Sequence, residues 1–164
     1  MPSFKNALLV LVTAAATAQA ERLRVVWSAG SFSAMAGPKG AGGGSGYKTG
    51  FAIINEDGEA IYDEDYPYDY APCFQNDGRD FEIVGECWDS YSFMFHCVAD
   101  FGGNPESCAV KDWEGNVLAE GESGSGTDFK GISINTGGAC VAEFESDGPG
   151  CPADDNDLYA INKG

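Results

Sequence analysis

The stretch SYSFMFHCVA, residues 90–99, carries the clearest structural signal in the chain. Successive side chains of a β-strand point to opposite faces of a sheet, so Tyr91, Phe93, Phe95 and Cys97 share one face. A face made of three aromatic rings and a cysteine is stable only when it is buried. We therefore expect residues 90–99 to form a strand that supplies the central stripe of a hydrophobic core.

Nine more short runs rich in Val, Ile, Phe and Tyr occur on both sides of this stretch, separated by turn residues. They are LRVVWSA (23–29), GFAIIN (50–55), EAIYDED (59–65), FEIVGECW (81–88), CAVKDW (108–113), NVLAEGE (116–122), FKGISIN (129–135), CVAEFE (140–145) and LYAIN (158–162). Helical periodicity with capping residues is not found. The pattern predicts an all-β, single-domain antiparallel β-sandwich or β-barrel.

Glycine marks the connections between these runs. EDG at 56–58 and WEG at 113–115 predict hairpins, because glycine adopts the positive φ that such turns need. The glycine-rich stretches 36–46 and 120–127 predict two long exposed loops.

Residues 1–20, MPSFKNALLVLVTAAATAQA, have the pattern of a secretory signal peptide. Lys5 precedes an apolar run, and Ala18-Gln19-Ala20 is a small-x-small cleavage site. The expected mature protein is a single all-β domain of residues 21–164, secreted to the extracellular space and monomeric.

The charge of the chain excludes several partners. Loss of Lys5 with the signal lowers the basic count from 9 to 8 against 26 acidic residues, so the net charge falls from −17 to −18. This charge repels phosphates and anionic lipids, and neither nucleic acid nor membrane is expected to bind. On charge alone, basic proteins, metal cations and neutral glycans remain open as partners.

All six cysteines follow the signal, and an even number in an exported chain predicts three disulfides. Proximity along the chain favours Cys97 with Cys108, Cys140 with Cys151, and Cys73 with Cys87. The sequence has no C-x-x-C and only one histidine, so no metal and no other cofactor is expected. The acidic tail, which includes Asp147, Asp154, Asp155, Asn156 and Asp157, departs from the calcium-loop pattern and is expected to be a solvated loop.

The ribbon YDEDYPYDYAPC, residues 62–73, is the candidate binding segment. Strand alternation separates its tyrosines from most of its acids, and Pro67 restricts it to an edge strand or a loop. One or two tyrosines are expected to be anchored in the sheet while the other residues face solvent. The candidate binding residues are Tyr62, Asp63, Asp65, Tyr66, Tyr68, Asp69 and Tyr70.

Two catalytic alternatives use residues outside this ribbon. Paired carboxylates, either Glu82 with Glu86 or Glu143 with Glu145, would suit a glycan hydrolase. Arg79, Glu82 and His96 would suit a ribonuclease, which the negative charge argues against. His96 is otherwise expected to be a half-exposed strand residue.

The signal peptide, the six cysteines, the acidity and the all-β pattern resemble the small secreted cysteine-containing proteins of filamentous fungi. That class includes effectors and elicitors sensed by plant hosts, among them inducers of the hypersensitive response. The resemblance implies a non-enzymatic protein that binds a host protein or a cell-wall glycan. A small acidic hydrolase that uses paired carboxylates on a glycan is the alternative.

Overall fold

The computed structural model describes residues 20–34, 47–90, 92–125, 128–129, 132–134, 137–148, 150–151 and 158–164. Within these ranges the regular structure is β-strand, apart from one short 3-10 turn, η1 (Pro67–Asp69). The bounds of the strands are β1 (Arg22–Ala34), β2 (Tyr47–Ile54), β3 (Ala60–Glu64), β4 (Arg79–Val84), β5 (Ser92–Ala99), β6 (Pro105–Lys111), β7 (Val117–Glu120), β8 (Glu122–Gly124), β9 (Asp128–Phe129), β10 (Ile132–Ile134), β11 (Ala139–Glu145) and β12 (Tyr159–Asn162). The predicted all-β class is confirmed.

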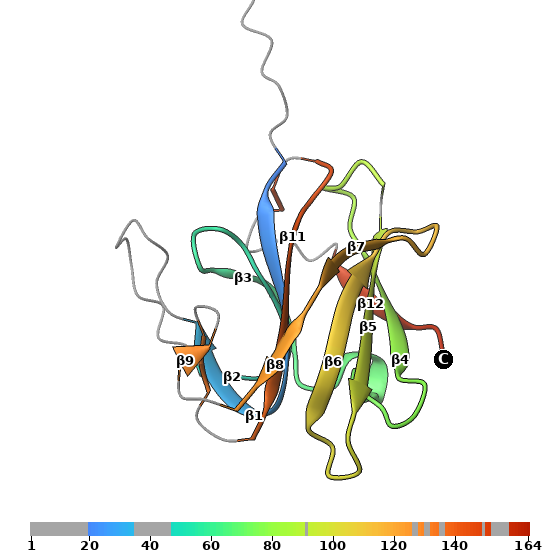
Figure 1. Ribbon diagram of the computed structural model, residues 1–164. Helices are drawn as coiled ribbons and strands as arrows, with labels where there is room; N and C mark the ends of the chain where they lie inside the picture. The colour runs from blue at the N-terminus through green and yellow to red at the C-terminus, as the bar shows by residue number, and fades with distance from the viewer. Residues whose placement is uncertain are drawn as a thin grey trace, which may run out of the picture.

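The strands form two antiparallel sheets that face each other (Figure 1). The larger sheet has the order β3-β2-β1-β10-β9, with β11 also paired to β1 and β8 paired to β11. The smaller sheet has the order β12-β4-β5-β6-β7. The sheets do not close on each other, so the fold is the sandwich and not the barrel.

Strand β5 lies in the middle of the smaller sheet, and its inward residues build the core as predicted. Phe93, Phe95 and Cys97 are buried, while Tyr91 lies outside the described residues. The two sheets meet through aromatic pairs: the ring centroids are 5.3 Å apart for Phe95 with Phe51 and 4.8 Å apart for Phe93 with Phe144. Such tilted and edge-to-face contacts are the preferred geometry of aromatic rings in a core.

The larger sheet is apolar on both faces near its centre. Behind the main core, a second buried cluster on the opposite face consists of Val26, Ala52, Ile54, Ala139 and Val141. Burial on both faces explains why the central strands read as unbroken apolar runs in the sequence instead of alternating patterns.

The run at residues 116–122 is not one strand, because the chain changes sheets at Gly121. Strand β7 pairs with β6 in the smaller sheet, whereas β8 pairs with β11 in the larger one. The Gly121 amide donates to the carbonyl of Cys108 at 2.7 Å, and a Cβ on Gly121 would lie 2.3 Å from the Cys108 Sγ. The predicted exposed loop 120–127 is therefore wrong for residues 120 and 122–124, which belong to strands; the other predicted loop, 36–46, lies outside the described residues.

Both predicted hairpins are present, and each turns on a glycine with positive φ: 86° for Gly58 and 88° for Gly115. A third hairpin joins β5 to β6 and has the same sequence pattern, Asp-aromatic-x-Gly-Asn, as the turn between β6 and β7. In each of these two loops, the leading aspartate accepts backbone N–H groups of the loop, and the closing asparagine donates to it. The side-chain bonds therefore fix both loops and present the aromatic residue at the tip.

The six cysteines form three disulfides, Cys73–Cys97, Cys87–Cys151 and Cys108–Cys140, and none is free. The number of bridges agrees with the prediction, but all three predicted pairings, Cys97–Cys108, Cys140–Cys151 and Cys73–Cys87, are wrong.

The error has a geometric cause. Cys97 and Cys108 are opposite each other on β5 and β6, with both strands in one sheet. The Cys108 side chain instead crosses the core to Cys140 on β11, so this bridge joins the two sheets, while Cys97 bonds to Cys73 of the loop that follows η1. Proximity along the chain does not report which distant segments the fold brings next to each cysteine.

Candidate binding surface

The ribbon 62–73 begins as the edge strand β3 of the larger sheet and then leaves the sheet. Its pairing with β2 ends at Glu64, opposite Phe51, and Pro67 opens η1 two residues after Asp65. Pro67 is buried, whereas the residues on both sides of it are exposed. The expectation that Pro67 would confine the ribbon to an edge or a loop is confirmed.

Tyr62 is the tyrosine that the sheet anchors. Its half-buried ring packs edge-on against Phe51, with centroids 6.0 Å apart, and its hydroxyl donates to Glu64. Burial, followed by the bond to Glu64, raises the pKa of the Tyr62 hydroxyl above its ordinary value. Tyr62 therefore anchors the start of the ribbon to the sheet, and its ring is only partly exposed to solvent.

The next three tyrosines face solvent, with exposed fractions of 58% for Tyr66, 62% for Tyr68 and 45% for Tyr70. Strict alternation would place them on the same side as Tyr62. It fails because Tyr68 and Asp69 have φ values of 55° and 62°, in the left-handed region that L-residues other than glycine rarely adopt. Strand β3 already ends at Glu64, and two such residues in succession keep the chain out of strand geometry, so the alternation does not apply to these rings.

The acids of the ribbon, Asp63, Asp65 and Asp69, are also exposed. The backbone at Asp65 packs closely over Gly50 of β2, where a Cβ would lie 2.3 Å from the Asp65 carbonyl oxygen. The ribbon is therefore packed closely on β2, and its acids are interspersed with the exposed tyrosines along the chain.

Although its ring is exposed, Tyr66 also contacts a residue of the core. Its ring lies edge-on to the buried Trp27, with centroids 6.0 Å apart and an angle of 60° between the rings. This contact holds one side of the exposed tyrosine against a rigid strand.

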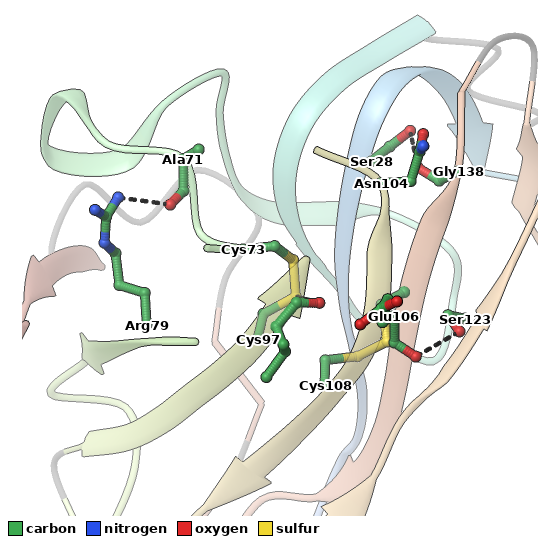
Figure 2. The surroundings of a disulfide bond; sticks show 12 residues. Ser28, Ala71, Cys73, Arg79, Cys97, Asn104, Glu106, Cys108, Ser123 and Gly138 are labelled. Atoms are coloured by element: carbon green, nitrogen blue, oxygen red, sulfur yellow. Dashed lines mark hydrogen bonds between the residues drawn. A yellow bond between two sulfur atoms is a disulfide. The ribbon is translucent and has the colours of Figure 1, made fainter. Parts of the chain in front are cut away.

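Arg79 and Phe74 extend the surface beyond the predicted residues. The Arg79 guanidinium lies 4.8 Å from the centroid of the Tyr70 ring and 4.7 Å from that of Phe74, and its Nη1 donates to the Ala71 carbonyl at 2.9 Å (Figure 2). A cation over two ring faces is a favourable arrangement. The Cys73–Cys97 bridge ties the backbone beside Phe74 to β5.

Phe101, at the tip of the hairpin between β5 and β6, borders the same region and is 90% exposed. The Gln75 side chain donates to the Phe101 carbonyl at 3.4 Å, and Phe74 itself pairs with the strand that leads into this hairpin. We call this surface the aromatic strip; it consists of Tyr66, Tyr68, Tyr70, Phe74, Arg79 and Phe101. Sequence reasoning did not assign Phe74, Arg79 or Phe101 to the binding surface, although the shared Asp-aromatic-x-Gly-Asn pattern would have predicted an exposed Phe101.

The residues of the ribonuclease hypothesis have different partners. His96 Nδ1 lies 2.8 Å from Asp80 Oδ1, which also contacts Lys111 Nζ at 3.4 Å. Glu82 accepts from Lys163 at 2.7 Å and from Ser92 at 3.0 Å, and these bonds lower its pKa, Lys163 being the main cause. These contacts and the stacked Arg79 form a network between strands, and the His96 side chain, 24% exposed, is more buried than the expected half-exposed residue.

One carboxylate pair of the hydrolase hypothesis, Glu143 with Glu145, comes from a single strand. Glu143 and Glu145 project from one face of β11 and line a groove of about 570 Å³ together with Arg22, Leu118 and Phe144. Arg22 contacts Glu143 at 3.6 Å. A glycosidase needs one carboxyl group on each side of the scissile bond.

Among the described residues, no group of three or more His, Cys, Asp or Glu side chains could hold a metal ion. The acidic tail residues Asp154, Asp155, Asn156 and Asp157 lie outside these residues. In the described ranges no helix is long and apolar enough to cross a membrane. Comparisons with protein-family models, curated proteins and solved structures returned no match for this chain.

Proposed function

We propose that this chain is an exported, non-enzymatic binding protein of the effector or elicitor type, and that the aromatic strip is the surface that contacts its partner. The observation that carries the proposal is the exposure of five aromatic rings around one stacked arginine. Three disulfides in a chain of this size are compatible with an extracellular location.

The composition of the strip favours a protein partner. Tyrosine and arginine are enriched among the residues that dominate the energetics of protein interfaces, and the rings bring large contact area at low entropic cost. The acids around them, Asp63, Asp65 and Asp69, suit Lys or Arg side chains of a partner. The overall charge of −17 favours a basic partner further.

Rigidity of the strip supports the same role. Tyr66 is held by Trp27, Tyr70 and Phe74 by Arg79, and the backbone between them by the Cys73–Cys97 bridge. The left-handed backbone conformation at Tyr68 is energetically unfavourable, and the surrounding structure holds it in place with the ring exposed. A surface that is ordered before binding loses less entropy when it binds.

The test compares three forms of the protein as immobilised baits for proteins of plant extracellular fluid. These are the unaltered protein, a strip variant with Tyr66→Ser, Tyr68→Ser and Phe74→Ser, and the control Trp113→Ser, which removes an exposed ring from the hairpin between β6 and β7. A partner captured by the unaltered protein and the control, but lost with the strip variant, is the expected result. Equal capture by all three forms would refute the proposal.

Two further assays address the alternatives. Strip-dependent binding to insoluble neutral polysaccharides, without a protein partner, would identify a cell-wall glycan as the target. Release of reducing ends from these polysaccharides would establish the hydrolase instead, and loss of that release in Glu143→Gln with Glu145→Gln would locate its carboxylates.

A further inference from the structure

A second surface lies at the point where the two sheets separate next to Gly121. Strand β8 pairs with β11 only from Ala139 to Val141, and its first residue, Glu122, follows β7 of the smaller sheet after Gly121. The groove of about 570 Å³ lies beyond this point, with Leu118 of β7 on one side and residues 143–145 of β11 on the other. In Figure 1 the ribbons of β7 and β11 run apart from each other.

Backbone pairing is incomplete on the groove side of β11. Within the described part of the chain, residues 142–145 pair with β1 on one edge, and no strand extends the β8 pairing past Val141 on the other. An edge of this kind offers N–H and C=O groups to an incoming strand.

The side chains around this edge alternate in character. Phe144 points inward and is nearly buried, while Glu143 and Glu145 point to the outer face. Leu118 on β7 is exposed and adds a second apolar wall. An added strand would therefore place one set of side chains beside two carboxylates and the next set between two apolar residues.

We infer that this groove accepts an extended segment of a partner protein that carries Lys or Arg at alternate positions with apolar residues between them. The segment pairs with the edge of β11 at residues 142–145, its cations facing Glu143 and Glu145 and its apolar side chains facing Leu118 and Phe144. Arg22 neutralises part of the Glu143 charge, so the second carboxylate sets the preference for a cation.

Charge complementarity decides between this occupant and a second copy of the chain. Two copies would each bring a net charge of −17 to the interface, with Arg22 as the cation that lines the groove. Like charges of this size oppose association. A cationic strand is instead attracted by the carboxylates of the groove and by the net negative charge of the protein.

The experiment uses two peptides of identical composition and charge, the alternating Lys-Val-Lys-Val-Lys-Val and the block Lys-Lys-Lys-Val-Val-Val. Each is titrated into the ¹⁵N-labelled protein at low salt while amide resonances are followed. The alternating peptide is expected to shift Leu118 and residues 142–145 saturably. The block peptide is expected to bind at least tenfold more weakly, because when its first and third lysines face the two carboxylates, its second lysine lies against the apolar Leu118 and Phe144. Equal affinities, or shifts centred elsewhere, would overturn the inference.

Variants separate the groove from general attraction to an acidic protein. Glu143→Gln with Glu145→Gln is expected to weaken the alternating peptide about tenfold, whereas the control Glu59→Gln with Glu106→Gln, which removes the same charge from exposed sites outside the groove, leaves its affinity unchanged. Equal weakening by both pairs would refute a specific site. Sedimentation that shows a dimer, dispersed by Leu118→Arg, would assign the groove to a second copy and overturn the cationic segment; melting temperatures verify that each variant is folded.

Discussion

The indole ring of Trp27 supports the ring of Tyr66, so that a residue of the core strand β1 holds a residue of the exposed surface. Trp27 lies opposite Phe51 on β2 and Cys140 on β11, and is therefore fixed on both sides by the sheet. The aromatic strip thus begins at the core and is not a loop that moves independently of it.

The ribbon combines anchored and exposed tyrosines, and these are expected to respond differently to substitution. Tyr62→Ala removes a ring that packs on Phe51 and should lower the free energy of unfolding by about 3 kcal/mol. Tyr68→Ala removes a ring in solvent and should change it by about 0.5 kcal/mol or less. Urea unfolding of both variants measures the difference, and equal losses would show that the two rings are packed alike.

The three aspartates of the ribbon are expected to contribute to partner binding more than to the stability of the fold. Asp63→Asn, Asp65→Asn and Asp69→Asn together should leave the melting temperature unchanged or raise it slightly, because exposed charges, paired or not, contribute little to stability and the variant relieves part of the net negative charge. The same triple variant should weaken capture of a basic partner. If the variant keeps full binding, the acids of the ribbon do not contact the partner, and the ribbon is only a protected edge of the sheet.

Local signals made much of the fold predictable. The alternation in residues 90–99 identified β5, and the glycines of EDG and WEG identified two hairpins, because these features depend only on neighbours in the chain. Pro67 correctly indicated that the ribbon leaves strand geometry, and its neighbours Tyr66 and Tyr68 are exposed.

Features that depend on contacts between distant segments could not be predicted. The three disulfide pairings, the change of sheet at Gly121 and the stacking of Arg79 on Tyr70 and Phe74 all join segments whose relative position the sequence does not encode locally. Cys97 and Cys108 illustrate the point, since they face each other across two strands and yet bond to other partners.

The bridge between the sheets should contribute strongly to stability. Cys108 and Cys140 are 32 residues apart, and in the chain-entropy model a loop of this length corresponds to about 4 kcal/mol. Cys108→Ala with Cys140→Ala should lower the free energy of unfolding by roughly this amount. Peptide mapping of the unreduced protein should recover the three bridges, and thiol titration after unfolding should find none free; a Cys97–Cys108 peptide would contradict the pairing.

Gly121 is expected to tolerate no side chain. Gly121→Ala places a Cβ against the Cys108 sulfur and 3.0 Å from the Val141 carbonyl, so the crossing between sheets must shift, at a cost of about 2 kcal/mol. Gly138→Ala is the matched control, because its nearest neighbour lies at 3.5 Å and ordinary contact results. Chemical unfolding of both variants tests the contrast, and equal stabilities would show that the crossing is loosely packed.

The melting temperature is expected to pass through a maximum in mildly acidic solution, because carboxyl groups with opposite pKa shifts act in different pH ranges. Burial, and then the charges of Glu56 and Asp57, raise the pKa of Glu21. The folded state therefore binds the Glu21 proton more tightly than the unfolded chain does, and stability increases as pH falls from 7 to about 4.5. Repulsion among the many acids acts in the same direction and weakens with salt.

On the acid side the sign reverses. Hydrogen bonds lower the pKa values of Asp100 and Asp112, chiefly the backbone N–H of Asn104 for the first and the side chain of Asn116 for the second. The stability that these two carboxylates contribute is present above their unfolded pKa of about 3.8 and is lost as pH falls through the lower folded values. Melting temperatures from pH 7 to pH 2 at constant high ionic strength should show both limbs. Glu21→Ala should flatten the first and Asp112→Asn the second, whereas a melting temperature that falls steadily from pH 7 to pH 5 would show that depressed carboxylates dominate throughout.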